Sequence, residues 1–385
     1  MVNVSYGAYS AIALTVWFGL RSLLRRHSFN AMDLLVILLV LIVFVSPMWV
    51  WSPVSSPQAV SSSLGAAASV LYVLPVRWVV RERQDFLRFA RIISWITSAY
   101  SAYFLLNASN LVGAGDIVTD RMSVEFANAN YTAAVISFGA VATLWLVCAT
   151  DSGVRFRVLY VLAAILQFAT VLQTGSRAAF AGMLVAILVI LALRRFARII
   201  HGLTLILMVF GFVIGFFPTA ATTLFRALAE PLGATGAFGR DAAAIATASG
   251  RSELWEVSRE IAAGSWLVGW GPGRYQLQEG PYFLPAHAWG LEYVASVGIL
   301  GTALIAFIVV RFYFGRDGRP WHALRGNGAL WNATTSIALV PSLMLSTHQW
   351  TLWAWVAIAL WARASVLEQS ASGELPESRP RFGRY

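Results

Sequence analysis

The residues best suited to chemistry gather in one stretch of the chain, from Gly250 to Gly301. It combines arginines, carboxylates and a single histidine, among them Arg251, Arg274, His287 and Glu292. Guanidinium groups bind phosphate oxygens in a bidentate way and keep their charge where water is scarce. An imidazole with a near-neutral pKa can take a proton from a hydroxyl group. The residue types therefore predict an active site that binds an oxyanion and activates a hydroxyl.

The chain as a whole has the composition of a membrane protein. Its 385 residues are 58% hydrophobic and 12% charged, against about half and about a quarter in soluble domains. Apolar runs of about 20 residues, the length that crosses a bilayer, recur from end to end. We expect one all-α polytopic domain over residues 1–364, with about eleven spans at 4–20, 32–50, 60–79, 91–107, 131–149, 155–173, 177–193, 199–217, 289–312, 329–346 and 348–364.

The distribution of arginine predicts how the spans are oriented. All 28 basic residues are Arg, and with alternating connections one set of connections carries 21 of them and the other 7. The positive-inside rule places the richer set, with Arg83 and Arg316, in the cytoplasm. Residues 218–288 then form a large extracytoplasmic loop that carries the site, and residues 365–385 a disordered cytoplasmic tail.

Several functions are excluded or disfavoured by what the sequence lacks. Without Lys there is no Walker A loop and no Schiff-base chemistry. Short juxtamembrane Arg clusters suit anionic headgroups of the lipid bilayer, so we expect no nucleic-acid partner. Cys148 is the single cysteine, and no Asp-x-Asp pair or Cys/His cluster occurs, so we expect no metal and no cofactor.

The long loop contains a helix followed by a sharp turn. From Arg251, the residues Leu254, Val257, Ser258 and Ile261 recur at helical spacing, while Trp255 shares a different face with Arg251. The sequence Gly269-Trp-Gly-Pro-Gly-Arg-Tyr then ends the helix. Its glycines and proline predict a turn that exposes backbone N–H groups.

A series of fragments, each weak alone, follows a specific order over roughly residues 125–305. They are Asn128-Ala-Asn130-Tyr-Thr-Ala, Gln173-Thr-Gly-Ser-Arg177, Gly250-Arg251 with Trp255, Leu267-Val-Gly269-Trp-Gly271-Pro-Gly273, and His287 with Leu291-Glu292 and Gly298-Ile-Leu-Gly301. This order resembles the bacterial O-antigen ligase and polymerase family of membrane glycosyltransferases. Ala288 departs from the pattern, because the family usually has Asn directly after the histidine.

The resemblance implies a GT-C-like membrane enzyme of the inner membrane with its active site on the extracytoplasmic face. The donor would be a glycan on polyprenyl (undecaprenyl) pyrophosphate, and the acceptor a hydroxyl of a glycan or glycolipid. His287 would be the catalytic base with Glu292 orienting it or binding acceptor sugar. Arg177, Arg251 and Arg274 would bind the pyrophosphate.

Structural roles remain open for the same residues. Arg177 suits an arginine at a hairpin tip whose charge reaches the interface, Arg251 suits surface ion pairs with nearby glutamates, and a histidine beside a membrane edge is often only interfacial.

Rival functions also remain open. A polymerase would carry the same motifs as a ligase. A transporter would require charged or broken helices at mid-membrane and often a repeat of half the chain, and the sequence indicates neither. A non-catalytic subunit of an envelope assembly complex would explain the missing Asn at position 288.

Overall fold

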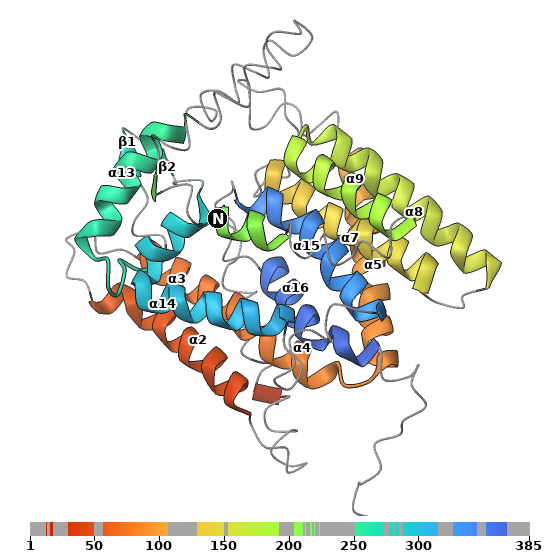
Figure 1. The fold of residues 1–385 in the computed structure, drawn as a ribbon, viewed down its shortest axis with the longest axis horizontal. Helices are drawn as coiled ribbons and strands as arrows, with labels where there is room; N and C mark the ends of the chain where they lie inside the picture. Colours follow the sequence, from red (N-terminus) through yellow and green to blue (C-terminus); the bar gives the residue numbers. More distant parts are fainter. Residues whose placement is uncertain are drawn as a thin grey trace, which may run out of the picture.

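The structure, a computed structural model, is a bundle of helices with one small β-hairpin (Figure 1). It describes residues 30–49, 57–106, 129–149, 153–191, 204–210, 251–272, 277–279, 282–284, 288–314, 326–344 and 352–367, with single positions at 13, 16, 17, 212, 216, 217, 219 and 223. The helices are α2 (Ala31–Trp49), α3 (Pro57–Leu71), α4 (Val73–Val79), α5 (Arg83–Leu106), α7 (Ala129–Ala149), α8 (Val154–Gln173), α9 (Arg177–Leu191), α13 (Arg251–Gly264), α14 (Trp289–Phe314), α15 (Gly326–Met344), α16 (Leu352–Arg363) and the 3₁₀-helix η5 (Ala364–Leu367).

The predicted helical class is confirmed, with one addition. Strands β1 (Leu277–Glu279) and β2 (Tyr282–Leu284) pair antiparallel, with Leu277 opposite Leu284. The sequence prediction did not include this hairpin, because each strand is only three residues long and falls below the length at which strand alternation can be recognised.

Helices α5, α7, α8, α9 and α15 pack into a closed bundle, which we call the helical bundle. At its centre every side chain of α15 from Ala329 to Val340 is buried. The Trp331 ring meets the edges of Phe86, Trp145 and Phe138 at centroid distances of 5.0, 5.1 and 6.2 Å. Such edge-to-face contacts add to the apolar burial that holds the bundle together.

Small residues bring the bundle helices close together. A Cβ at Gly139 would overlap the side chain of Thr97, and one at Gly182 would overlap the carbonyl of Ile337. Close approach of this kind is typical of helix packing in membranes, where there is no hydrophobic force between helices.

A second group of helices lies beside the bundle. Here α2 packs against α3 and α14, α13 packs against α14, and α16 with α4 lies between the two groups. An ion pair between Asp33 of α2 and Arg77 of α4 joins helix ends, and the Arg77 guanidinium lies 4.8 Å from the ring of Phe312 in α14. These contacts tie the ends of α2, α4 and α14 together.

Among the described residues, four helical segments are long and apolar enough to cross a membrane: Ser62–Val79, Tyr131–Cys148, Val154–Gln173 and Trp289–Phe314. Shorter apolar helices cover Ala31–Pro47, Ala178–Ile190 and Leu352–Leu367. These segments coincide with seven of the predicted spans. The predicted spans 91–107 and 329–346 fall in α5 and α15, which are not among these segments. Most of the first span and much of the span at 199–217 lie outside the described residues, so the count of eleven spans and the GT-C class stay predictions.

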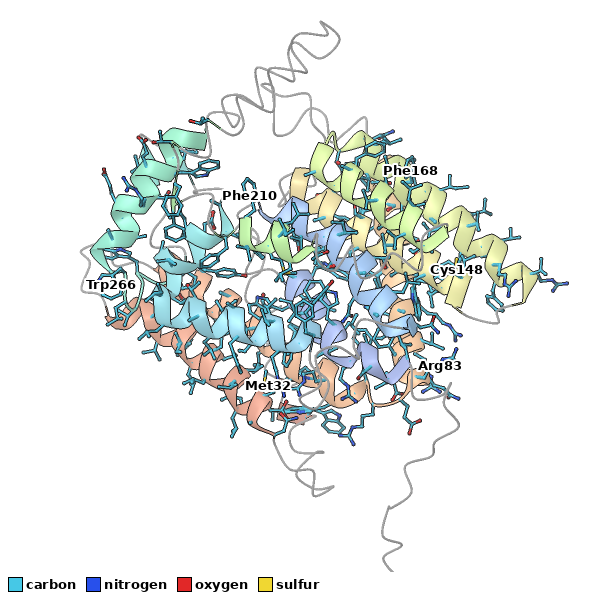
Figure 2. The ribbon with its side chains drawn as sticks, viewed as in Figure 1. Met32, Arg83, Cys148, Phe168, Phe210 and Trp266 are labelled. Atoms are coloured by element: carbon cyan, nitrogen blue, oxygen red, sulfur yellow. The ribbon has the colours of Figure 1, made fainter. Side chains whose placement is uncertain are left out.

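The orientation that the arginine distribution predicts for the spans stays a prediction. Figure 2 places Met32, Arg83 and Cys148, near connections of the Arg-rich set, along the lower and right side, with Trp266 at the opposite side. Residues 365–367 of the predicted tail are part of η5, whereas residues 368–385 lie outside the described residues. Arg316 lies outside them as well.

Candidate functional site

Helix α14, which begins directly after the predicted catalytic histidine, is broken into two half-helices. Gly298 has φ 66° and ψ −178°, far from helical values. We call residues 289–297 the first half and residues 299–314 the second half of α14. Figure 1 shows the two halves running in different directions. Only glycine adopts this conformation readily, so Gly298 fixes the position of the break.

The turn after α13 pairs with the peptide groups that the break leaves open. We call Ser265–Gly271 the pairing turn. In a continuous helix Ile299 N would donate to Ala295 O, and Leu300 N to Ser296 O. Instead Trp270 N donates to Ala295 O at 2.7 Å, Gly271 N to Ser296 O at 2.8 Å, Ile299 N to Trp266 O at 2.8 Å and Leu300 N to Leu267 O at 3.4 Å. All four groups are therefore satisfied by the turn.

This pairing corrects the prediction that the glycine-rich turn exposes its N–H groups. The N–H groups of Trp270 and Gly271 are bonded to α14. A buried peptide group without a partner costs free energy in apolar surroundings, and the broken helix supplies acceptors at the right spacing. The described part of the turn therefore serves the adjoining helix; Gly273 and Arg274 lie outside the described residues.

Two glycines make the close contact possible. A Cβ at Gly269, where φ is 75°, would lie 2.5 Å from Gly298 N, and a Cβ at Gly298 would overlap Leu267 O. Neither glycine can be replaced without moving backbone against backbone. The two fragments Leu267–Gly273 and Gly298–Gly301 of the sequence pattern are thus the two sides of one contact.

Helix α13 brings the pairing turn to α14 by a face that only partly agrees with the predicted one, because Ser258 is buried as predicted, whereas Val257 is exposed and Trp255 is buried. Its buried positions are Trp255, Ser258 and Ala262, while Val257 is 41% exposed. The small Ala262 packs with Val294 and Ala295 of α14, and the predicted Ile261 lies partly buried against this cluster. The indole Nε1 of Trp270 donates to Ile261 O at 2.7 Å and links the turn to the end of α13.

Glu292 lies in the first turn of α14, with its side chain fully buried. Its backbone N–H donates to Ala288 O at 3.0 Å. A buried carboxylate among apolar helices is expensive unless it has partners, and it marks a functional site by default. Glu292 is the predicted site residue whose side chain the structure describes.

The other predicted site residues are placed only in part. Arg177 is the first residue of α9 and Arg251 the first residue of α13, with side chains outside the described residues. Arg274 and His287 lie wholly outside them. Nothing described therefore brings the five predicted residues together. Next to Arg177, the turn at Gly175 has φ 65° and Ser176 is buried.

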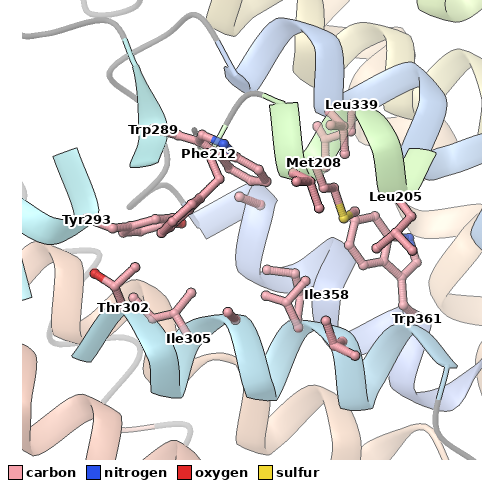
Figure 3. A pocket seen from close by; sticks show the side chains of 16 residues that line it. Leu205, Met208, Phe212, Trp289, Tyr293, Thr302, Ile305, Leu339, Ile358 and Trp361 are labelled. Atoms are coloured by element: carbon pink, nitrogen blue, oxygen red, sulfur yellow. The ribbon is translucent and has the colours of Figure 1, made fainter. Parts of the chain in front are cut away.

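An apolar cavity of about 240 Å³ lies beside the broken helix (Figure 3). Trp289 and Tyr293 line it from the first half of α14. The second half contributes Thr302, Ile305, Ala306, Val309 and Val310, and the remaining walls are Leu205, Met208, Val209, Phe212, Leu339, Val340, Ala354, Ile358 and Trp361. Leu205, Val209 and Val310 are each at least 40% exposed, so the cavity is bordered by apolar surface. An apolar chain is the chemistry that fits it.

The broken helix also corrects the statement that the sequence indicates no break. The signal was present, since a glycine inside a long apolar helix often marks a kink or a close backbone contact. It was missed because Gly301 follows in the same motif and nothing local distinguishes the two. Position 301 keeps helical geometry, whereas Gly298 does not. The cavity had no sequence signal, because its walls come from four separate segments.

Together these features describe a helical protein with apolar helices of membrane-spanning length, a buried carboxylate, a broken helix and an apolar cavity beside it. Residues 162–306 match the family model described as O-Antigen ligase. The match agrees with the resemblance to the O-antigen ligase family that the sequence shows. The match supports a membrane function of O-antigen ligase or polymerase type and indicates an inner-membrane protein. Comparison with curated proteins and with solved structures finds no match.

Proposed function

We propose that the protein transfers a glycan from polyprenyl pyrophosphate to an acceptor hydroxyl on the extracytoplasmic face of the inner membrane, in the manner of an O-antigen ligase. The observation that carries the proposal is the buried Glu292 in the first turn of the broken helix, inside the matched segment. A buried carboxylate five residues after His287 suits a site at the headgroup level.

The apolar cavity supports a lipid-linked donor. Its walls are aliphatic and aromatic side chains, with the hydroxyl of Thr302 bonded to Gly298 O at 2.7 Å. Such walls offer little to a sugar, whereas they can pack closely against the methyl and methylene groups of an isoprenoid chain. Trp289 lines the cavity three residues before Glu292, so a chain bound there would have its pyrophosphate end near the predicted site.

The roles of the site residues follow from charge and depth. Arg177, Arg251 and Arg274 hold the pyrophosphate and offset its charge as it leaves. His287 takes the proton of the acceptor hydroxyl, which then attacks the anomeric carbon, so that the sugar inverts in one displacement. Glu292 orients His287 or binds the acceptor sugar. The reaction needs no metal, because the Arg cluster supplies the positive charge.

The transporter alternative is weakened by how the break is filled. Transporters use broken helices to present open backbone groups to a substrate. At Gly298 the carbonyls of Ala295 and Ser296 and the N–H groups of Ile299 and Leu300 are all bonded to the pairing turn. A polymerase remains the alternative within the same family.

The central experiment replaces the proposed base. His287→Ala should abolish detectable glycan transfer in cells without lowering the amount of protein in the membrane, because loss of a general base costs roughly a hundred- to ten-thousand-fold. Purified enzyme should work in excess chelator. Transfer within a few-fold of wild type would remove His287 from the mechanism; if Glu292→Gln were active as well, the non-catalytic subunit would become the better reading.

The proposed orientation is tested by labelling. In a Cys148→Ala background, single cysteines at positions 240 and 316 are treated with a membrane-impermeant reagent in intact cells. Reaction at position 240 and protection at position 316 are expected, because 21 of 28 Arg then face the cytoplasm. The reverse pattern would overturn the topology and the location of the site.

A further inference from the structure

We propose that the pairing turn Ser265–Gly271 is a positioning element that holds the two halves of α14 in one fixed relation, so that the site around Glu292 stays at a constant distance from the donor chain in the apolar cavity. The inference rests on the proposed function and adds a role for residues that touch neither the pyrophosphate nor the sugar. Ser265 and the contact between Gly269 and Gly298 carry this role.

The two halves of α14 have different tasks on either side of the break. The first half holds Glu292 and presents Trp289 and Tyr293 to the cavity, with their rings 6.3 Å apart. The second half forms much of the cavity wall from Thr302 to Val310. The angle at Gly298 therefore sets the distance between the carboxylate and whatever occupies the cavity.

Backbone pairing fixes that angle from both sides. Trp270 and Gly271 bond to the last carbonyls of the first half, and Trp266 and Leu267 bond to the first N–H groups of the second half. One short segment thus holds both halves. A hinge would need these groups to separate in apolar surroundings, where unpaired peptide groups are costly.

The turn itself is held by contacts that do not involve α14. Ser265 Oγ donates to Gly269 O at 2.9 Å, and Gly269 N donates to Ser265 O at 2.8 Å. Gly271 lies against Pro47 of α2, where a Cβ would be 2.9 Å from the proline Cα. The turn is therefore stabilised by its own hydrogen bonds and by its contact with α2, in addition to its pairing with α14.

Ser265→Ala tests the positioning role with a small change. The variant removes one hydrogen bond of the turn and leaves the backbone pairs to α14 available. We expect kcat to fall about tenfold, since small misplacements of reacting groups are costly, while KM for a polyprenyl-pyrophosphate glycan and the amount of protein stay within about twofold. Ser265→Thr keeps the hydroxyl group, so its kcat should stay at the wild-type level. Gly298→Ala should lower kcat more strongly.

The outcomes separate positioning from stability. A fall in protein amount with unchanged kcat in Ser265→Ala would mean that the turn only stabilises the fold, and it would overturn the inference. A Ser265→Thr variant with the same low kcat as Ser265→Ala would overturn it too. If Gly298→Ala does not accumulate, Ser265→Ala still decides. A wild-type protein without glycan transfer would overturn the proposed function, whereas active wild type with unaffected variants would overturn the positioning role alone.

A cross-link tests whether the relation is fixed. The pair Trp266→Cys and Ile299→Cys, in a Cys148→Ala background, joins positions whose backbones are bonded at 2.8 Å and whose side chains are exposed. We expect the oxidised pair to transfer glycan as fast as the same pair after reduction. An oxidised form that is inactive until reduced would mean that the turn must open, and absence of a cross-link would contradict the contact itself.

Discussion

The helical bundle and the broken helix α14 solve the same problem in opposite ways. Both must satisfy polar groups in apolar surroundings. In the bundle, hydroxyl and amide side chains bond across or along unbroken helices: Gln167 Nε2 of α8 reaches Thr97 Oγ1 and Ser98 Oγ of α5 at 2.8 and 3.0 Å. In α14 the backbone itself is interrupted, and a separate segment of chain restores its hydrogen bonds.

This difference between the two regions indicates which of them is expected to take part in the reaction. An unbroken bundle with buried side-chain bonds resists change and suits a scaffold. A break filled by an outside segment requires glycines on both sides and the packing of α2, α13 and α14 around it. The interrupted backbone costs folding free energy. Such costs are typical of functional sites, and here the break places Glu292 beside a cavity. The two regions should therefore respond differently to substitution.

The largest effect in this comparison is expected at the arginines that begin α9 and α13. Arg177 starts a helix of the bundle and Arg251 starts the helix that supports the broken one. If both bind the pyrophosphate, Arg177→Lys and Arg251→Lys should each lower transfer by roughly ten- to a hundredfold, because Lys keeps the charge but loses the planar fork. Transfer assays at equal protein amount measure this.

Arg259→Lys is the matched control for these two variants. Arg259 lies on the exposed face of α13, and its replacement should leave transfer unchanged. If both Arg177→Lys and Arg251→Lys transferred glycan as fast as wild type, Arg274 would become the residue proposed to bind the pyrophosphate. An effect of Arg251→Lys alone would confine the site to the second group of helices and leave the bundle purely structural.

The two regions also differ in how far the sequence predicted them. Unbroken apolar helices could be located to within a few residues, as α7 and α8 show against the predicted spans 131–149 and 155–173, because hydropathy and length are local properties. The pairing between Leu267 and Leu300 is not local. Of the site, Glu292 was recognised as an intramembrane carboxylate. The cavity and the burial of Trp255 depend on which helices meet, and one sequence does not contain that information.

A filled cavity should weaken donor binding without touching the chemistry. Ala306 lines the cavity from the second half of α14, and Ala306→Phe puts a ring into it. Loss of about ten atom contacts with the cavity walls, at about 0.1 kcal/mol each, costs about 1 kcal/mol, so KM for a long-chain donor should rise roughly fivefold. A donor with a short lipid chain should be little affected, and kcat should change little for either donor.

Ala303→Phe is the control for the cavity variant. Ala303 is an exposed residue of the same helix and is not among the residues that line the cavity. An equal rise of KM for long and short donors, or an equal effect of Ala303→Phe, would mean that the lipid chain binds elsewhere. The first half of α14 would then hold Glu292 without a lipid site beside it.

The smallest effect is expected inside the bundle, at Gln167. Its Nε2 makes three hydrogen bonds to α5, to Ser94 O, Thr97 Oγ1 and Ser98 Oγ. Interhelical bonds in membranes contribute about 0.6 kcal/mol each. Within the described part of the chain no donor reaches Gln167 Oε1, which offsets part of that gain. Gln167→Leu should therefore cost about 1 kcal/mol and lower the melting temperature by about 2–4 °C.

Glycan transfer by Gln167→Leu at 25 °C should stay within about twofold of wild type, because the bundle supports the site without taking part in it. Thermal unfolding in detergent and transfer assays on the same preparation measure both quantities. Gln84→Leu, at an exposed position of α5, should change neither. A tenfold loss of transfer at unchanged melting temperature would contradict the division between a structural bundle and a functional broken helix. The polar contacts of the bundle would then take part in the reaction as well.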